Sequence, residues 1–499
     1  MKSNQNLIWV LLLFIQTSNF AQKLAKLPES KLPSSETEMH LRFLAADEMM
    51  GRKTGEQGNF VASRYIAEHF RALGLKPAAG ANSYLQKVPF NDMKPSTEGE
   101  IFVGNDTLKI NDDFIILEGK AADLKGLPVV FVGYGATADD YKNADVKGKI
   151  VIAQLGTPTT EKPFDAIQAS EAKTKLAADA GALALVEIFT AQLPWKRIVG
   201  YFNASRLVLD MKKEGEAEIT MPHLWVSSTR AALFNKEKMT VLSLKTLDKV
   251  KKPILSHNVV GVLEGTDPVL KNEYVILSAH FDHIGTSKKG SPGYSETDTI
   301  FNGSRDNAFG CSAVLFAAKC LSQERPKRSI LFIAFTGEEI GLLGSQYYAA
   351  NPLVPLKQCV YNLNCDGAGY NDVTILTTLG LNRTDCKTEL ETASNAFGLK
   401  IIDDPAPEQN LFDRSDNVSF AGKGIPAPTF SPGFTKFDEA IFKYYHKEGD
   451  NPETVDFPYL HKYCQVYTHA ARLIANRKNA PKWTVGDKYE TPWKALYGK

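Results

Sequence analysis

The stretch SILFIAFTGEEIGLLGS, residues 329–345, decides the fold. Its first part, residues 330–335, is an apolar run with the length and composition of a buried strand. Two adjacent carboxylates, Glu338 and Glu339, follow a Thr-Gly turn, and the chain then enters a predicted helix. Open α/β sheets place their chemistry at the carboxyl ends of such strands. The competing interpretation is a pair of solvated glutamates in a loop.

Several other apolar runs end in residue types that bind metal ions. The residues of these types are His280, Asp282, His283, Asp306, Asp366 and His446, in addition to Glu338 and Glu339. Together they supply two histidines and three carboxylates, with at least one spare carboxylate and a spare histidine. Such a set can hold two divalent ions that share one bridging carboxylate.

The motifs HFDHIG, NGSRDNAFG, FTGEEIGLLGS, NLNCDGAG and YYHKEGDNPETVD lie in this order within residues 274–456. They closely resemble those of the co-catalytic zinc aminopeptidases of the M28 type. The resemblance implies that Asp306 bridges two zinc ions. One zinc ion would then take His280 and Asp366, and the other would take Glu339 and His446. It also implies a hydrolase that removes amino-terminal residues from peptide substrates.

The residues beside the predicted ligands have expected roles of their own. Glu338 is left free when Glu339 binds metal, so we expect it to act as the general base and then the acid. Asp282 suits a carboxylate that orients the ligand His280 and raises its basicity. His283 could do similar work, but a hydrogen-bonding role within its loop is favoured.

The order of strands and helices predicts the domain organisation. Alternating strands and helices on both sides of a strand-dense insert favour an α/β fold, with a mixed, mostly parallel sheet and helices on both faces. We assign residues 22–100 and 251–499 to the peptidase domain. Residues 101–250 form the insert, which resembles a protease-associated domain. Residues 1–21 have the composition of a secretory signal peptide, which predicts export to the periplasm or the extracellular space.

A loop at residues 413–420 is expected to line the substrate pocket. It resembles a family loop in which a Ser-Asp pair is followed by histidine, but Asn417 occupies that position here. Asp416 would lie at an acidic rim that attracts the amino terminus of a peptide, and Phe420 would offer an apolar wall. Arg414 could instead bind a substrate carboxylate, as could Arg305.

Composition excludes some functions and leaves others open. Lys plus Arg total 58 and Asp plus Glu total 57, and no basic run indicates nucleic-acid binding. Outside the signal peptide, no segment reads as a membrane span. Cys311 and Cys365 lie near proposed ligands, but buried thiols are the favoured interpretation. There are three competing functions: a carboxypeptidase or dipeptidase, a one-zinc glutaminyl cyclase, and a non-catalytic receptor-like binding module. The complete five-ligand set argues against the cyclase, and also against the receptor-like module, which would be expected to have lost ligands.

Overall fold

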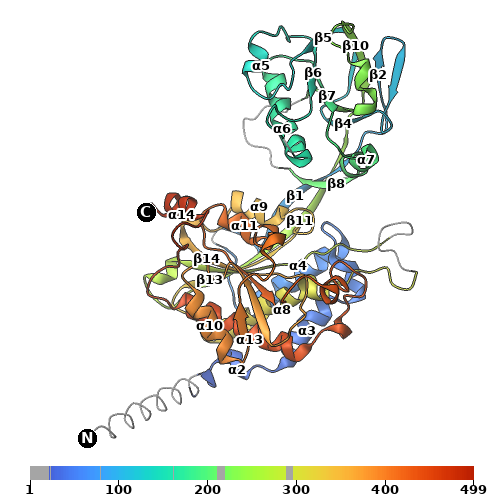
Figure 1. Ribbon diagram of the computed structural model, residues 1–499. Coiled ribbons are helices and arrows are strands. Elements are labelled where there is room, and N and C mark those ends of the chain that lie inside the picture. The colour runs from blue at the N-terminus through green and yellow to red at the C-terminus, as the bar shows by residue number, and fades with distance from the viewer. Residues whose placement is uncertain are drawn as a thin grey trace. The chain divides into compact units, whose positions relative to one another are not determined.

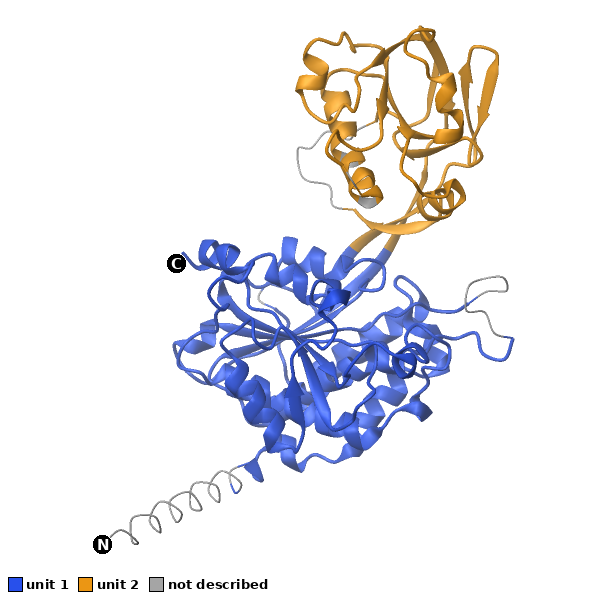
Figure 2. Ribbon diagram, in the orientation of Figure 1, with its two compact units in different colours: residues 1–88, 255–499 blue, residues 89–254 orange. Residues whose placement is uncertain are grey.

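The protein is described here by a computed structural model (Figure 1). The described residues are 22, 24–78, 80–160, 162–210, 220–287 and 296–498, so the predicted signal peptide at 1–21 lies outside them. The chain divides into two compact units, residues 1–88 with 255–499 and residues 89–254 (Figure 2). The sequence prediction placed the insert at 101–250.

Among the described residues, one mixed sheet organises the first unit. Its strands, in sheet order, are β16 (Lys400–Ile402), β15 (Ile375–Leu379), β17 (Thr429–Pro432), β14 (Cys359–Cys365), β12 (Tyr274–His280), β13 (Ser329–Phe335), β11 (Val250–Leu263), β1 (Leu85–Lys94) and β8 (Arg206–Leu209). The centre of the sheet is parallel, because β17, β14, β12 and β13 all run in one direction. β11 and β15 pair antiparallel to their neighbours β13 and β17. The predicted mixed α/β fold is confirmed.

Helices cover both faces of this sheet. The helices of the first unit are α2 (Pro28–Lys31), α3 (Ser34–Leu44), α4 (Gln57–Ala72), α8 (Phe309–Gln323), α9 (Leu343–Ala350), α10 (Lys387–Ala396), α11 (Asn417–Ala421), α12 (Glu439–Phe442), α13 (Phe457–Ala475) and α14 (Glu490–Tyr497). Helices α3, α4, α8, α10 and α13 bury apolar residues in one core cluster, and α9 and α11 bury theirs in another (Figure 1).

The β13 strand shows why helices are needed on both faces. Ile330 and Phe332 enter the first core cluster, whereas Leu331, Ile333 and Phe335 enter the second. Side chains alternate along a strand, so a run that is apolar at every position must be buried on both faces. The continuous apolar run at residues 330–335 therefore places β13 in the interior of the sheet.

The second unit is built on a separate sheet, apart from β8, which belongs to the mixed sheet described above. Its strands, in sheet order, are β3 (Asp106–Lys109), β2 (Gly99–Val103), β10 (Val241–Thr246), β5 (Ala122–Phe131), β6 (Ile150–Gln154), β7 (Ala184–Phe189), β9 (His223–Ser227) and β4 (Phe114–Glu118). Its helices are α5 (Asp139–Lys142), α6 (Pro163–Asp179) and α7 (Trp195–Phe202). Strands β1 and β11 cross the boundaries at which the chain passes between the units. Inside the unit, buried Glu187 accepts hydrogen bonds from Lys173 and Trp225 and pairs with His223.

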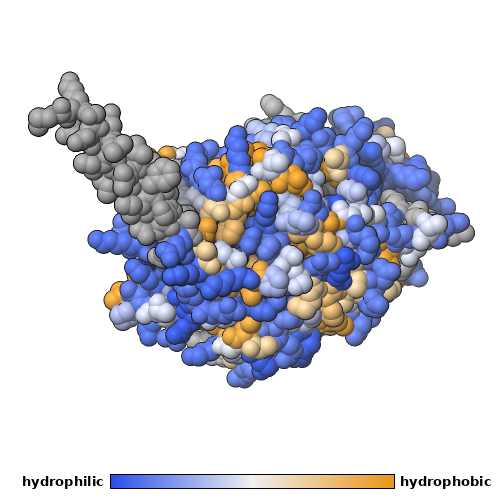
Figure 3. All heavy atoms as spheres, turned by 90° about the horizontal axis from the view of Figure 1, so that it is seen from below, coloured by the Kyte–Doolittle hydropathy of each residue, from blue (hydrophilic) through white to orange (hydrophobic). Residues whose placement is uncertain are grey.

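The surface view in Figure 3 is mostly hydrophilic, with apolar side chains in small separate patches. In the part of the chain that the structure describes, no helix has both the length and the apolar character needed to cross a membrane. All six cysteines are buried and free, which agrees with the interpretation of Cys311 and Cys365 as buried thiols.

Gly344 generates a test of the packing beside β13. A Cβ atom at this position would lie 1.9 Å from the backbone oxygen of Thr336 and 2.7 Å from Asn258 Oδ1. A backbone oxygen cannot swing aside, so we expect Gly344→Ala to lower the free energy of unfolding by about 1–3 kcal/mol in urea denaturation. Gly200→Ala in α7 is the control, because its Cβ would meet open space. An unchanged urea midpoint for Gly344→Ala would contradict this packing.

Candidate active site

The predicted metal ligands come from separate elements and meet at one edge of the sheet. His280 is the last residue of β12, Asp366 follows β14, and Glu339 lies in the turn after β13. These strands are parallel, so their carboxyl ends lie side by side. Asp306 precedes α8, and His446 follows α12. The structure brings all five side chains together.

Asp306 lies between the two histidines. Its Oδ1 is 3.2 Å from His280 Nε2, and its Oδ2 is 3.1 Å from His446 Nε2. Each oxygen of this buried carboxylate therefore faces a different histidine, which is the arrangement expected of a ligand that bridges two ions.

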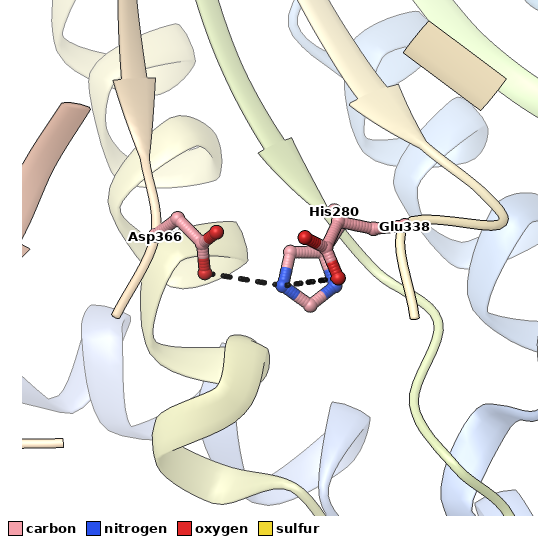
Figure 4. Close-up of side chains that lie close together, drawn as sticks. All are labelled: His280, Glu338 and Asp366. Atoms are coloured by element: carbon pink, nitrogen blue, oxygen red, sulfur yellow. Dashed lines mark hydrogen bonds and ion pairs between the residues drawn. The ribbon is translucent and has the colours of Figure 1, made fainter. Parts of the chain in front are cut away.

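Two groups of possible ligand atoms surround this carboxylate. In the first, His280 Nε2 is 3.2 Å from Asp366 Oδ1 and 4.0 Å from Glu338 Oε2 (Figure 4). In the second, His446 Nε2 is 3.0 Å from Glu339 Oε2. Ligand atoms bound to one tetrahedral zinc ion lie about 3.3 Å apart, given bond lengths of about 2.0–2.1 Å. The donor types and spacings present here fit such ions.

Burial and mutual charge shift the pKa values of these groups. Burial would raise the pKa of Asp306, but hydrogen bonds from His280 and His446 outweigh it and hold the pKa far below its usual range. Burial opposes the charged form of His446, but Asp306 and Glu339 raise its pKa to about 10. Burial and the nearby carboxylates raise the pKa of Glu338 well above its ordinary value, against the opposing effect of His280.

Asp282 lies next to the candidate metal ligands, and it contacts other residues as well as His280. His280 Nδ1 is 3.2 Å from the backbone oxygen of Asp282 and 3.8 Å from its carboxylate. The carboxylate accepts hydrogen bonds from the hydroxyl of Thr54 at 2.9 Å and from the backbone N–H of Glu338 at 3.2 Å. Asp282 therefore joins the loops that carry His280 and Glu338, and burial raises its pKa to about 6.

Three contacts at the site were missed by sequence reasoning. The fully buried guanidinium of Arg52 donates to the backbone oxygens of Leu44, Phe281, Asn302 and Gly303. Ser415 donates to Asp366 Oδ2. His283, for which a loop role was favoured, has its Nδ1 2.6 Å from Glu339 Oε1. No local pattern signals these contacts, because each joins segments far apart in the chain.

A cavity opens beside the carboxylates. Its charged lining residues are Asp306, Glu338, Glu339, Asp366, Arg414 and His446. Its larger apolar lining residues are Leu379, Leu411, Phe434, Phe437, Ile441 and Tyr445.

The predicted substrate-binding residues are divided between cavity and core. Arg414 is exposed and lines the cavity. Phe420 does not line it, because its ring is fully buried between Phe335 and Tyr348. Asp416 is also fully buried and lies away from any rim, and burial raises its pKa to about 7.

The chain resembles known proteins over most of its length. Residues 258–471 match the model of peptidase family M28. Aminopeptidase YwaD of Bacillus subtilis is 24% identical over 356 residues, covering 71% of this chain and 68% of the relative. The probable leucine aminopeptidase 2 of Aspergillus oryzae is 27% identical over 282 residues, covering 54% of this chain and 47% of the relative. The solved aminopeptidase of Aneurinibacillus sp. strain AM-1 covers 91% of this chain and 96% of its own, with a TM-score of 0.52 and 20% identity, and so shares the fold.

The matched segment contains His280, Asp306, Glu339, Asp366 and His446, the five side chains that converge at the sheet edge. Residues 258–471 of this chain are therefore similar to peptidase family M28, and they supply all five candidate metal ligands.

Proposed function

We propose that this protein is an exported aminopeptidase with two zinc ions. The observation that carries the proposal is the Asp306 carboxylate, whose two oxygens face His280 and His446 from opposite sides. Aminopeptidases among the relatives support the reaction class. Export rests on the sequence of residues 1–21.

The five converging residues would hold the metal ions. His280 and Asp366 would bind one ion, Glu339 and His446 would bind the other, and Asp306 would bridge them. Imidazole and carboxylate donors without a thiolate suit zinc. Bound zinc ions would lower the pKa of a water molecule and polarise the scissile carbonyl.

Glu338 is the proposed general base. It lines the cavity, and its carboxylate reaches to 4.0 Å from His280 Nε2. Its backbone N–H donates to Asp282, which holds the backbone from which the side chain projects. Glu338 would take a proton from the attacking water and deliver it to the leaving amine nitrogen.

The cavity favours the amino end of a peptide with an apolar first residue. Of the four carboxylates that line it, three are proposed zinc ligands, and Glu338 remains to attract an ammonium group and repel a carboxylate. The side chains of Phe434, Phe437 and Ile441 offer an apolar wall in place of Phe420. This selectivity follows from the charge and the composition of the lining.

One observation favours a carboxypeptidase as the second candidate. Arg414 lines the cavity and could bind a substrate carboxylate. Arg305 cannot share this role, because its guanidinium is buried against Asp450 and Thr454. A one-zinc glutaminyl cyclase and a receptor-like binding module are disfavoured, because each would lack part of the five-ligand set that is complete here.

Glu338→Gln tests the general base. The amide has nearly the same shape but cannot accept the proton, so we expect turnover to fall about 10²–10⁴-fold. Both zinc ions should remain, as measured by elemental analysis of the purified variant. Glu339→Ala is the matched comparison, because it should lose zinc. Near-normal turnover, or zinc loss in the Glu338 variant, would refute the assignment.

Zinc binding should release protons at pH 7. The pKa of His446 is about 10 without metal, so its imidazole is protonated at pH 7, whereas a metal ligand must be neutral. Calorimetric zinc titration in buffers of different ionisation enthalpy measures this release. When zinc binds, the His446→Ala variant should release about one proton fewer than the unaltered chain. Heats that do not depend on the buffer would contradict the prediction.

Blocked peptides test the direction of attack. With zinc present, we expect cleavage of aminoacyl-nitroanilides with large apolar side chains and loss of cleavage after acetylation of the amine. Carboxyl amidation of a peptide should change the rate little, because the acidic cavity offers no advantage to a carboxylate. The opposite pattern would replace the aminopeptidase by a carboxypeptidase.

A further inference from the structure

His283 contacts a predicted metal ligand, although a hydrogen-bonding role within its loop was the favoured expectation. It lies three residues beyond the end of β12 and is 1% exposed. Its Nδ1 is 2.6 Å from Glu339 Oε1. The other oxygen of the same carboxylate, Oε2, is 3.0 Å from His446 Nε2. Glu339 is thus held on one oxygen by His283 and faces the metal position with the other.

The length of this contact distinguishes a hydrogen bond from shared coordination. His283, Asp306 and Glu339 are close enough to one another to form a three-ligand group by proximity alone. Two ligand atoms of one tetrahedral zinc ion, however, lie about 3.3 Å apart. The contacts of His280 and His446 with Asp306 are near that value, at 3.2 Å and 3.1 Å. The 2.6 Å contact is too short for shared coordination and is a charge-assisted hydrogen bond.

The direction of the hydrogen bond follows from the chemistry of Glu339. A carboxylate that binds a metal ion is deprotonated and can only accept hydrogen bonds. Nδ1 of His283 must therefore carry the hydrogen and act as the donor of this hydrogen bond to Glu339. Nε2 of His283 is buried and has no hydrogen-bond partner among the described residues, so nothing draws the proton to that nitrogen.

The ring of His283 is held in place from two sides. Its backbone N–H donates to the backbone oxygen of Arg52 at 3.4 Å. Gly303 packs against the ring, and a Cβ atom there would lie 2.6 Å from His283 Cδ2. Gly303 has a φ of 59° and accepts a hydrogen bond from Arg52 at 3.0 Å. Arg52 thus fixes both segments that enclose the ring.

We propose that His283 is a positioning residue for the second metal position, where its Nδ1–H holds Glu339 Oε1 and leaves Oε2 free to bind the ion that His446 also binds. This inference rests on the two-zinc function proposed above. The dipeptide Asp282-His283 would then support both metal positions, because Asp282 holds His280 by its backbone oxygen and His283 holds Glu339 by its ring.

Zinc affinity tests the proposal without reference to turnover. We expect metal-free His283→Ala to bind one zinc ion with unaltered affinity and the second about 10–100-fold more weakly, in competition with a chromogenic chelator. His283→Asn should restore most of the second affinity, because its Nδ2 lies near the position of Nδ1 and can donate. His283→Gln should not restore this affinity, because its amide nitrogen lies near the position of the histidine Nε2 and not near that of Nδ1. His461→Ala in α13 is the control for loss of a histidine outside the site.

The outcomes separate this proposal from the function on which it rests. Equal second-site affinity in His283→Ala and the unaltered chain overturns the positioning role and leaves the two-zinc function intact. Equal affinities in the Asn and Gln variants also overturn it, and this comparison holds even where the Ala variant fails to fold. An unaltered chain that binds no second zinc ion overturns the two-zinc function, and the inference falls with it.

Discussion

The carboxylate of Asp306, which faces one histidine with each oxygen, is the interaction on which the rest of the site depends. Around it lie more carboxylates than histidines, and all of these carboxylates are at least half-buried. Like charges in a medium of low dielectric repel one another strongly. Burial, with a smaller contribution from neighbouring carboxylates, raises the pKa values of Glu338 and Asp416. Bound cations would offset the negative charge of these carboxylates.

Arg52 supplies a positive charge near these carboxylates and also holds parts of the site in place. It is fully buried, and its hydrogen bonds go to backbone oxygens instead of a carboxylate. Two of these acceptors, Asn302 and Gly303, precede Asp306, and a third, Phe281, follows His280. The guanidinium therefore ties together the segment that supplies His280 and the segment that supplies the bridging Asp306. Burying an unpaired cation is costly, and the surrounding carboxylates offset part of that cost.

Much of the candidate site could be predicted from sequence because its ligands sit at the ends of apolar runs. His280, Glu339 and Asp366 are placed by the strands that precede them, and strand ends are readable locally. Phe420 shows the limit of this reasoning. An apolar ring near a site can line a cavity or fill a core, and only the position of Phe335 and Tyr348 decides between these. The same applies to the contact between His283 and Glu339, which requires the register of two strands.

His446, like Asp306, is not positioned by a strand, and a buried ion pair holds the loop in which it lies. It lies in a loop after α12 with a φ of 54°, a left-handed conformation that most residues avoid. Arg305 reaches this loop with its guanidinium 2.8 Å from Asp450 Oδ1, while its backbone N–H donates to Asp450 Oδ2 at 2.8 Å. The same guanidinium packs on the ring of Tyr444, 3.8 Å from its centre. Because Arg305 is next to Asp306 in the chain, this ion pair couples the bridging carboxylate to the histidine loop. The metal position of His280 and Asp366 therefore depends on two strand ends, whereas the position of Glu339 and His446 depends on one strand end and on a buried ion pair packed against an aromatic ring.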